Sequence, residues 1–185
     1  TFMVVRNLLG FNTVIWTTYS TVYLADGRGV GLADATISVF PFVSAVVTMA
    51  VILLAGQRTD GREALGSLVA GQVLNIVACV FFVVSPAGTL IWALLWAVAS
   101  ALSVAVFRPA NDSYWANIVG DRERALILSA SGALAALVTL PAAPLAGILY
   151  TTSPRAPFML GIVIQVVALG LTLFLPRERT EQQAT

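Results

Sequence analysis

Histidine and lysine are absent from this 185-residue chain, and cysteine occurs once, at Cys79. Without histidine, the chain cannot build His-based metal sites or the Ser–His and Cys–His pairs of nucleophilic enzymes. Without lysine, Schiff-base chemistry is excluded, and a single cysteine cannot form an intrachain disulfide. We therefore expect a protein that is not an enzyme and that uses neither a metal nor a cofactor.

Charge is also scarce. Charged residues make up 10% of the chain, against roughly 25% in soluble domains, and 58% of the residues are hydrophobic. The net charge of +1 gives no basic field for binding nucleic acid. The longest uncharged run covers the 44 residues between Glu63 and Arg108, with a turn-like Ser85–Gly88 near its middle. Each half has about 20 residues, enough for a helix to cross a bilayer. The composition indicates an integral, multi-pass membrane protein.

Six apolar segments of about bilayer length can be drawn, and none alternates polar and apolar residues as a membrane β-strand would. We predict an all-α membrane fold, with a six-helix transmembrane bundle over 1–176 and a polar cytoplasmic tail over 177–185. If the connecting segments alternate across the bilayer, eight arginines fall on one side and two on the other. This bias predicts a plasma (inner) membrane protein with both termini cytoplasmic. The segments cover approximately 8–24, 35–55, 65–84, 89–110, 125–150 and 157–176.

Two of these segments carry a polar and aromatic stripe. At about 100° per residue, the four stripe residues of the first segment fall within an arc of roughly 60°. An amide in hydrocarbon needs a partner or water, so each stripe is either the wall of a substrate cavity or a surface for helix packing. The candidate cavity residues are Asn12, Trp16, Tyr19 and Tyr23 in the first segment, and Trp92, Trp96, Ser100 and Ser103 in the fourth.

Other polar residues stand apart from these stripes. Arg108 and Asp112 are four residues apart and share a helix face, which favours a structural pair or a gate element over a substrate ligand. Gln72, Asn75 and Gln165 are isolated among apolar neighbours, where hydrogen bonds between helices are the expected role. Candidate helix kinks are Pro41, Pro141 and Pro144.

The loop after the second segment reads GQRTDGRE over 56–63. It resembles the signature G-x-x-x-D-R-x-G-R-R of the major facilitator superfamily, between the second and third helices of a six-helix half. Gly56 and Asp60 keep the family spacing, whereas the following Gly-Arg pair comes two residues early. The stretch from Phe107 to Ala125 is similar to the family's link between the fourth and fifth helices.

The resemblance implies one six-helix half of a major facilitator fold. The degenerate loop, the short polar tail and the lack of an initiator methionine favour the C-terminal half. The family also implies that the first, second, fourth and fifth helices line a central cavity. By the same resemblance, salt bridges close the cytoplasmic side; the gate candidates are Asp60, Arg62, Arg108 and Asp112.

We therefore expect a secondary active transporter of small solutes that works by alternating access, with this chain as one helical half. The expected partners are a small-molecule substrate, the lipid bilayer and a second six-helix half, in the same polypeptide or in a partner chain. A lining of aromatic and hydroxyl groups without fixed charge favours a neutral or amphipathic solute. Two alternatives stay open: a non-transporting membrane binding or assembly protein of the same fold, and a homodimeric half-size carrier.

Overall fold

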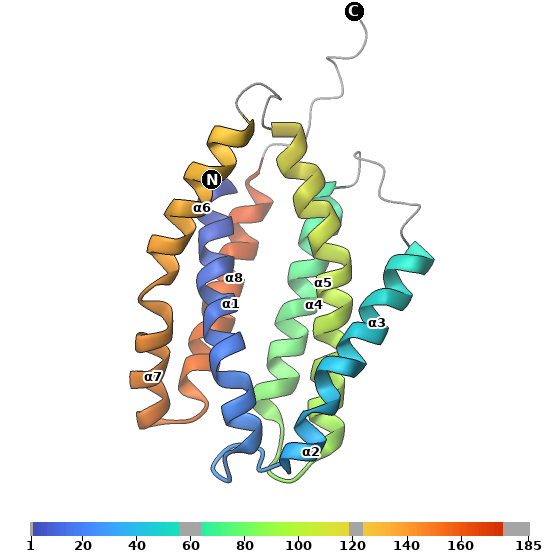
Figure 1. The fold of residues 1–185 in the computed structure, drawn as a ribbon, viewed down its shortest axis with the longest axis vertical. Helices are drawn as coiled ribbons and strands as arrows, with labels where there is room; N and C mark the ends of the chain where they lie inside the picture. The colour runs from blue at the N-terminus through green and yellow to red at the C-terminus, as the bar shows by residue number, and fades with distance from the viewer. Residues whose placement is uncertain (1, 56–63, 119–123, 176–185) are drawn as a thin grey trace, which may run out of the picture.

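The computed structural model describes residues 2–55, 64–118 and 124–175, and these residues form only helices, turns and loops (Figure 1). This confirms the all-α fold expected from the lack of polar and apolar alternation. The helices are α1 (Phe2–Ala25), α2 (Asp34–Ile37), α3 (Val39–Ala55), α4 (Ala64–Val84), α5 (Leu90–Ile118), α6 (Arg124–Thr139), α7 (Ala142–Thr152) and α8 (Ala156–Leu173).

Two pairs of helices each follow one another as a single rod. Only Ser38 separates α2 from α3, and only Leu140 and Pro141 separate α6 from α7. Pro141 has no backbone N–H and cannot continue the hydrogen-bond ladder of α6, so the break predicted there is confirmed. Pro41 and Pro144 lie in the first turns of α3 and α7, where proline is tolerated, and the break at Ser38 lies three residues before Pro41. Within the described residues the helices therefore form six rods.

Five of the rods are long and apolar enough to cross a membrane: Asp34–Leu54, Ala64–Val84, Leu90–Trp115, Ser129–Thr152 and Ala156–Leu173. These five rods indicate a multi-pass membrane protein. The sixth, α1, has 24 residues but is not among them. It carries an arginine, two asparagines and a series of threonines and tyrosines, and this polar content distinguishes it from the five apolar rods.

The rods pack as two groups with a space between them. α1 packs against α6, α7 and α8, whereas α4 packs against α5 and α8, and α3 lies outside α5. In the described part of the chain the backbones of α1 and α5 stay apart, and the two helices meet through the side chains of Phe2, Tyr114 and Trp115 at one end. Figure 1 shows α4 and α8 behind the space between α1 and α5.

Each end of the bundle has its own apolar cluster. At one end, called here the arginine end, Phe2 at the start of α1 packs with Leu68, Tyr114 and Leu175. At the other, called the aromatic end, the cluster includes Tyr23, Phe82, Tyr150 and Phe158. Because Phe2 and Leu175 share one cluster, α1 begins where α8 ends, as an even number of rods requires. The predicted tail over 177–185 lies outside the described residues.

Candidate functional site: a polar cavity between α1 and α5

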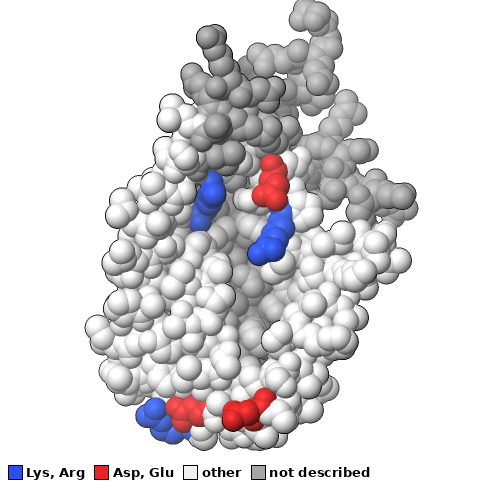
Figure 2. Space-filling model, viewed as in Figure 1, with Lys and Arg blue, Asp and Glu red and all other residues white. Residues whose placement is uncertain are grey.

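A cavity of about 640 Å³ lies between α1, α4, α5 and α8. Figure 2 shows this face hollowed between charged side chains near one end of the molecule. The lining changes from arginine and aspartate at the arginine end to tryptophan toward the aromatic end. Seven of the candidate cavity and gate residues line it: Asn12, Trp16, Trp96, Ser100, Ser103, Arg108 and Asp112.

The floor of the cavity is built from amides that join helices. Asn12 Nδ2 donates to Gln165 Oε1 at 3.0 Å, which ties α1 to α8. Gln72 Nε2 donates to Thr172 Oγ1 at 2.8 Å, which ties α4 to α8. The hydrogen bonds between helices expected of Gln72 and Gln165 are therefore confirmed. All four side chains are buried, so each bond forms where water cannot replace it.

Asn75 differs from the other floor amides. It lines the cavity, is half-buried, and has no hydrogen-bond partner among the residues that the structure describes. Its amide can both donate and accept. The role in helix packing expected for Asn75 is not what its surroundings show, and a ligand in the cavity would lie within its reach.

The stripe predicted on the first segment is divided between two environments. Asn12 and Trp16 line the cavity, but Tyr19 and Tyr23 do not. The Tyr19 hydroxyl donates to the carbonyl of Ala143 at 3.3 Å, toward α7. Tyr23 is fully buried and its hydroxyl accepts from Arg155 Nε at 3.2 Å. The structure thus places these two tyrosines in packing contacts, outside the cavity.

The stripe on the fourth segment is divided in the same way. Trp96, Ser100 and Ser103 line the cavity, whereas Trp92 does not and packs on Phe81 with ring centroids 5.9 Å apart. Ser103 Oγ donates to the carbonyl of Gly71 on α4 at 2.8 Å. A Cβ atom at Gly71 would lie 2.7 Å from Phe107 Cβ, so glycine is required for α4 and α5 to approach this closely.

Five rings close the cavity toward the aromatic end, and we call them the aromatic plug. Phe82 is at their centre: its ring centroid lies 4.6 to 5.1 Å from the centroids of the other four rings. Trp16 and Trp96 belong to both features, because each lines the cavity and each contacts the ring of Phe82. The members of the plug are Trp16, Tyr23, Phe82, Trp96 and Phe158.

Arginines at the other end give the cavity fixed charge, which corrects the expectation of an uncharged lining. Arg6 and Arg108 both line it, together with Asp112. Arg6 Nη1 donates to Ser131 Oγ at 2.9 Å, and the guanidinium lies 5.1 Å from the ring of Trp115. The predicted pairing of Arg108 with Asp112 is wrong, because no ion pair within 4.0 Å joins them.

Some cavity residues were missed, although the sequence carries a signal for them. Arg6, Gly10, Thr13 and Thr17 are spaced by four, three and four residues, and all of them line the cavity. That spacing defines a second polar or small-residue face on α1, beside the stripe that was noted. The gate candidates Asp60 and Arg62 lie outside the described residues.

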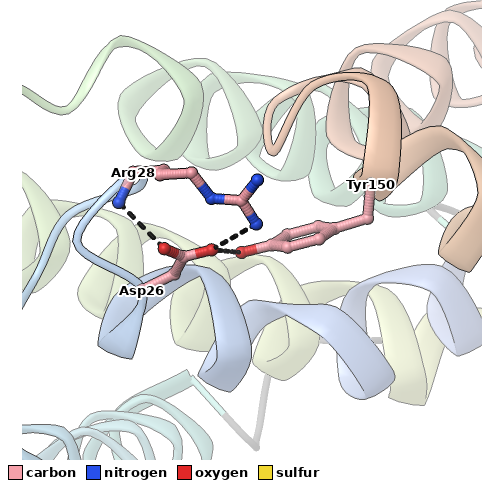
Figure 3. A network of polar contacts seen from close by, with 3 residues as sticks. All are labelled: Asp26, Arg28 and Tyr150. Atoms are coloured by element: carbon pink, nitrogen blue, oxygen red, sulfur yellow. Dashed lines mark hydrogen bonds and ion pairs between the residues drawn. The ribbon is translucent and has the colours of Figure 1, made fainter.

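Loops at the aromatic end are tied together by a charged network (Figure 3). Asp26, which follows α1, accepts from the backbone N–H and guanidinium of Arg28 at 2.9 and 3.1 Å, and from the Tyr150 hydroxyl at 2.9 Å. These hydrogen bonds, that from the Arg28 backbone above all, hold the pKa of Asp26 below its ordinary value of 3.8. Because Tyr150 belongs to α7, the network joins the end of α1 to the end of α7.

No family model, curated protein or solved structure matches this chain. Among the described residues there is also no group of three or more His, Cys, Asp or Glu side chains that could hold a metal ion. The side chains that line the cavity offer amides, hydroxyls, indole rings and guanidinium groups for hydrogen bonding and stacking.

Proposed function

We propose that the protein is a secondary active transporter of small solutes that works by alternating access, with this chain as one six-helix half of a major facilitator fold. The observation that carries the proposal is the cavity of about 640 Å³ with a polar lining, set between α1 and three rods apolar enough to cross a membrane. Small-molecule sites commonly have volumes of roughly 300–1,000 Å³. Polar groups inside a membrane bundle are costly and generally mark a solute pathway.

The difference between the two ends of the cavity supports alternating access. The aromatic plug and the Asp26 network close one end, whereas charged and exposed side chains line the other. A carrier must be closed on one side while it is open on the other. The two least buried spans, Asp34–Leu54 and Ser129–Thr152, lie on either side of the cavity, so a second six-helix half could cover this face.

Cysteine labelling from each side of the membrane tests the proposal. Cys79 is the only cysteine, so a Cys79→Ala background carrying Ser100→Cys places one thiol in the cavity. Leu95→Cys, on an exposed apolar position of the same helix, is the matched control. Right-side-out and inside-out vesicles are treated with a membrane-impermeant methanethiosulfonate.

Alternating access predicts that the thiol at position 100 reacts from both sides, at different rates, while the thiol at position 95 reacts from neither. Reaction at position 100 from one side only would indicate a binding or assembly protein and would contradict transport.

A further inference from the structure

We propose that the cavity binds an organic anion with an apolar or aromatic body, with its anionic group held by Arg6 and Arg108. This inference rests on the proposed function in taking the cavity as the solute site, and it specifies the chemical class of that solute. It replaces the expectation of a neutral solute, which assumed a lining without charge.

Among the described residues, the charges that line the cavity do not cancel. Arg6 and Arg108 contribute two positive charges, and Asp112 contributes one negative charge. Asp112 accepts from Asn111 Nδ2 at 3.3 Å, and Arg108 makes no ion pair with any acidic side chain in the described ranges. Arg6 gives one N–H to Ser131, and a guanidinium has five donors. Both arginines therefore retain donors for an anionic group.

The rest of the lining suits the body of such a molecule. Trp16 and Trp96 lie toward the aromatic plug and offer ring surface, and Asn75 offers an unpaired amide between the two ends. Water occupies about 30 Å³ per molecule in the liquid, so an inorganic anion would fill only a small part of about 640 Å³. The volume and the rings therefore favour an organic anion over an inorganic one.

An anionic lipid could present the same chemistry. A second groove of about 510 Å³ runs between α3 and α5 and shares Ser100, Val104 and Arg108 with the cavity. Its other lining residues are mostly apolar, including Met49 and Ile52, as an acyl chain would require. A lipid headgroup and a soluble anion must therefore be distinguished by experiment.

The test uses the full protein in phosphatidylcholine nanodiscs, with Cys79→Ala and Ser100→Cys, and follows the rate of labelling by the neutral reagent N-ethylmaleimide. Two probes share one ring system: 8-anilinonaphthalene-1-sulfonate carries a sulfonate, and N-phenyl-1-naphthylamine does not. Each probe is compared with itself across variants, so its partitioning into lipid cancels. We expect Arg108→Gln to weaken protection by the sulfonate about tenfold and to leave protection by the neutral probe unchanged.

Two further variants test whether protection by the sulfonate changes in the direction that the charge of each residue predicts. Asp112→Asn removes a repulsive charge and should strengthen protection by the sulfonate about threefold. Asp34→Asn, which removes an exposed carboxylate at the aromatic end, should change neither probe. The proposal is overturned if both probes respond equally to Arg108→Gln, or if Asp34→Asn strengthens sulfonate protection as much as Asp112→Asn does. Arg108 is exposed, so the variant should fold.

Two more comparisons distinguish a lipid from a soluble anion, and failure of the anion site from failure of the proposed transport function. If phosphatidylglycerol without probe slows labelling and Arg108→Gln restores the rate, the anionic chemistry holds and its source is a lipid. If phosphatidylglycerol has no effect while the sulfonate protects, the source is a soluble anion. Sulfonate protection together with one-sided labelling would support the anion site and reject transport. Two-sided labelling without an effect of Arg108→Gln would support transport and reject the anion site.

Discussion

The two ends of the cavity are built by opposite means. At the aromatic end, side chains from distant segments bind one another: Tyr150 donates to Asp26, Arg155 donates to Tyr23, and the rings of the plug pack around Phe82. At the arginine end, Arg108 and Asp112 line one cavity without forming an ion pair. The comparison indicates that one end is held closed by contacts within this chain, while at the other end Arg108 and Asp112 are not paired with each other.

Replacement of Phe82, at the centre of the aromatic plug, should give the largest loss of stability. Phe82 is fully buried and contacts four other rings, so Phe82→Ala should destabilise the protein by about 3 kcal/mol, the low end for buried phenylalanine. The low end applies because lipid, rather than water, is the alternative solvent for these helices. Denaturant unfolding of the detergent-solubilised protein measures the loss.

The adjacent residue provides the control for this variant. Phe81 is half-buried, and the only ring it contacts among the described residues is that of Trp92. Phe81→Ala should therefore cost much less than Phe82→Ala. Equal losses would mean that the plug does not hold the aromatic end together.

Within one group of rods, α4 and α5 approach each other closely at Gly71. A Cβ atom at Gly71 would lie 2.7 Å from Phe107 Cβ and 3.0 Å from Phe107 Cα, so Gly71→Ala must displace backbone and should cost about 1–3 kcal/mol. Gly66 on the same helix has nothing within 4 Å, and Gly66→Ala should instead stabilise by about 0.5–1 kcal/mol. Unfolding midpoints that move in the same direction for both variants would contradict the close approach.

The floor between the two ends can be tested by a double-mutant cycle. Asn12→Leu and Gln165→Leu each leave the other amide without its bond, and the double variant removes both groups. We expect a coupling free energy of about 0.6–1.7 kcal/mol, as for hydrogen bonds between membrane helices. Thr13→Val is the control, because the Thr13 hydroxyl donates only to the carbonyl of Leu9 within its own helix. Additive effects at Asn12 and Gln165 would show that the bond contributes nothing to stability.

The sequence predicts the rods well, because the apolar runs have bilayer length and Pro141 interrupts one of them. It predicts the lining less well. Asn12, Trp16, Tyr19 and Tyr23 do share one face of the helix, but helix geometry alone does not predict which other helix packs against each of them. Tyr23 lies outside the cavity, and its hydroxyl accepts from Arg155, which is 132 residues away in the chain. Contacts of this kind depend on packing between distant segments.

Arg6 is the opposite case, because it lines the cavity although it was not among the cavity residues predicted from the sequence. Its position near the start of α1 suggests a residue at the membrane surface, counted only for orientation. Its place in the cavity follows from the bond to Ser131 on α6 and the ring of Trp115 on α5, which hold its side chain between two other rods. Neither partner is near it in sequence, so only the spacing of Arg6, Gly10, Thr13 and Thr17 could have indicated it.

The smallest expected effect is a pH dependence at the aromatic end. Since its hydrogen bonds lower the pKa of Asp26, ionised Asp26 stabilises the folded state at pH values above its ordinary value of 3.8. That stabilisation should be lost as the pH falls through the lowered pKa, when the carboxylate becomes protonated. Thermal unfolding of wild type and Asp26→Asn from neutral pH to pH 3 should show a constant difference at first and a smaller one in acid.

Asp34→Asn separates this network from general charge effects. Asp34 is exposed near the same end of the bundle, and its side chain makes no hydrogen bond in the described part of the chain. If the difference between wild type and Asp34→Asn follows pH as the Asp26 difference does, the effect comes from net charge. If only Asp26→Asn and Tyr150→Phe lose the acid dependence, the closed state of the aromatic end is held by a titratable contact, whereas the described residues at the arginine end form no ion pair.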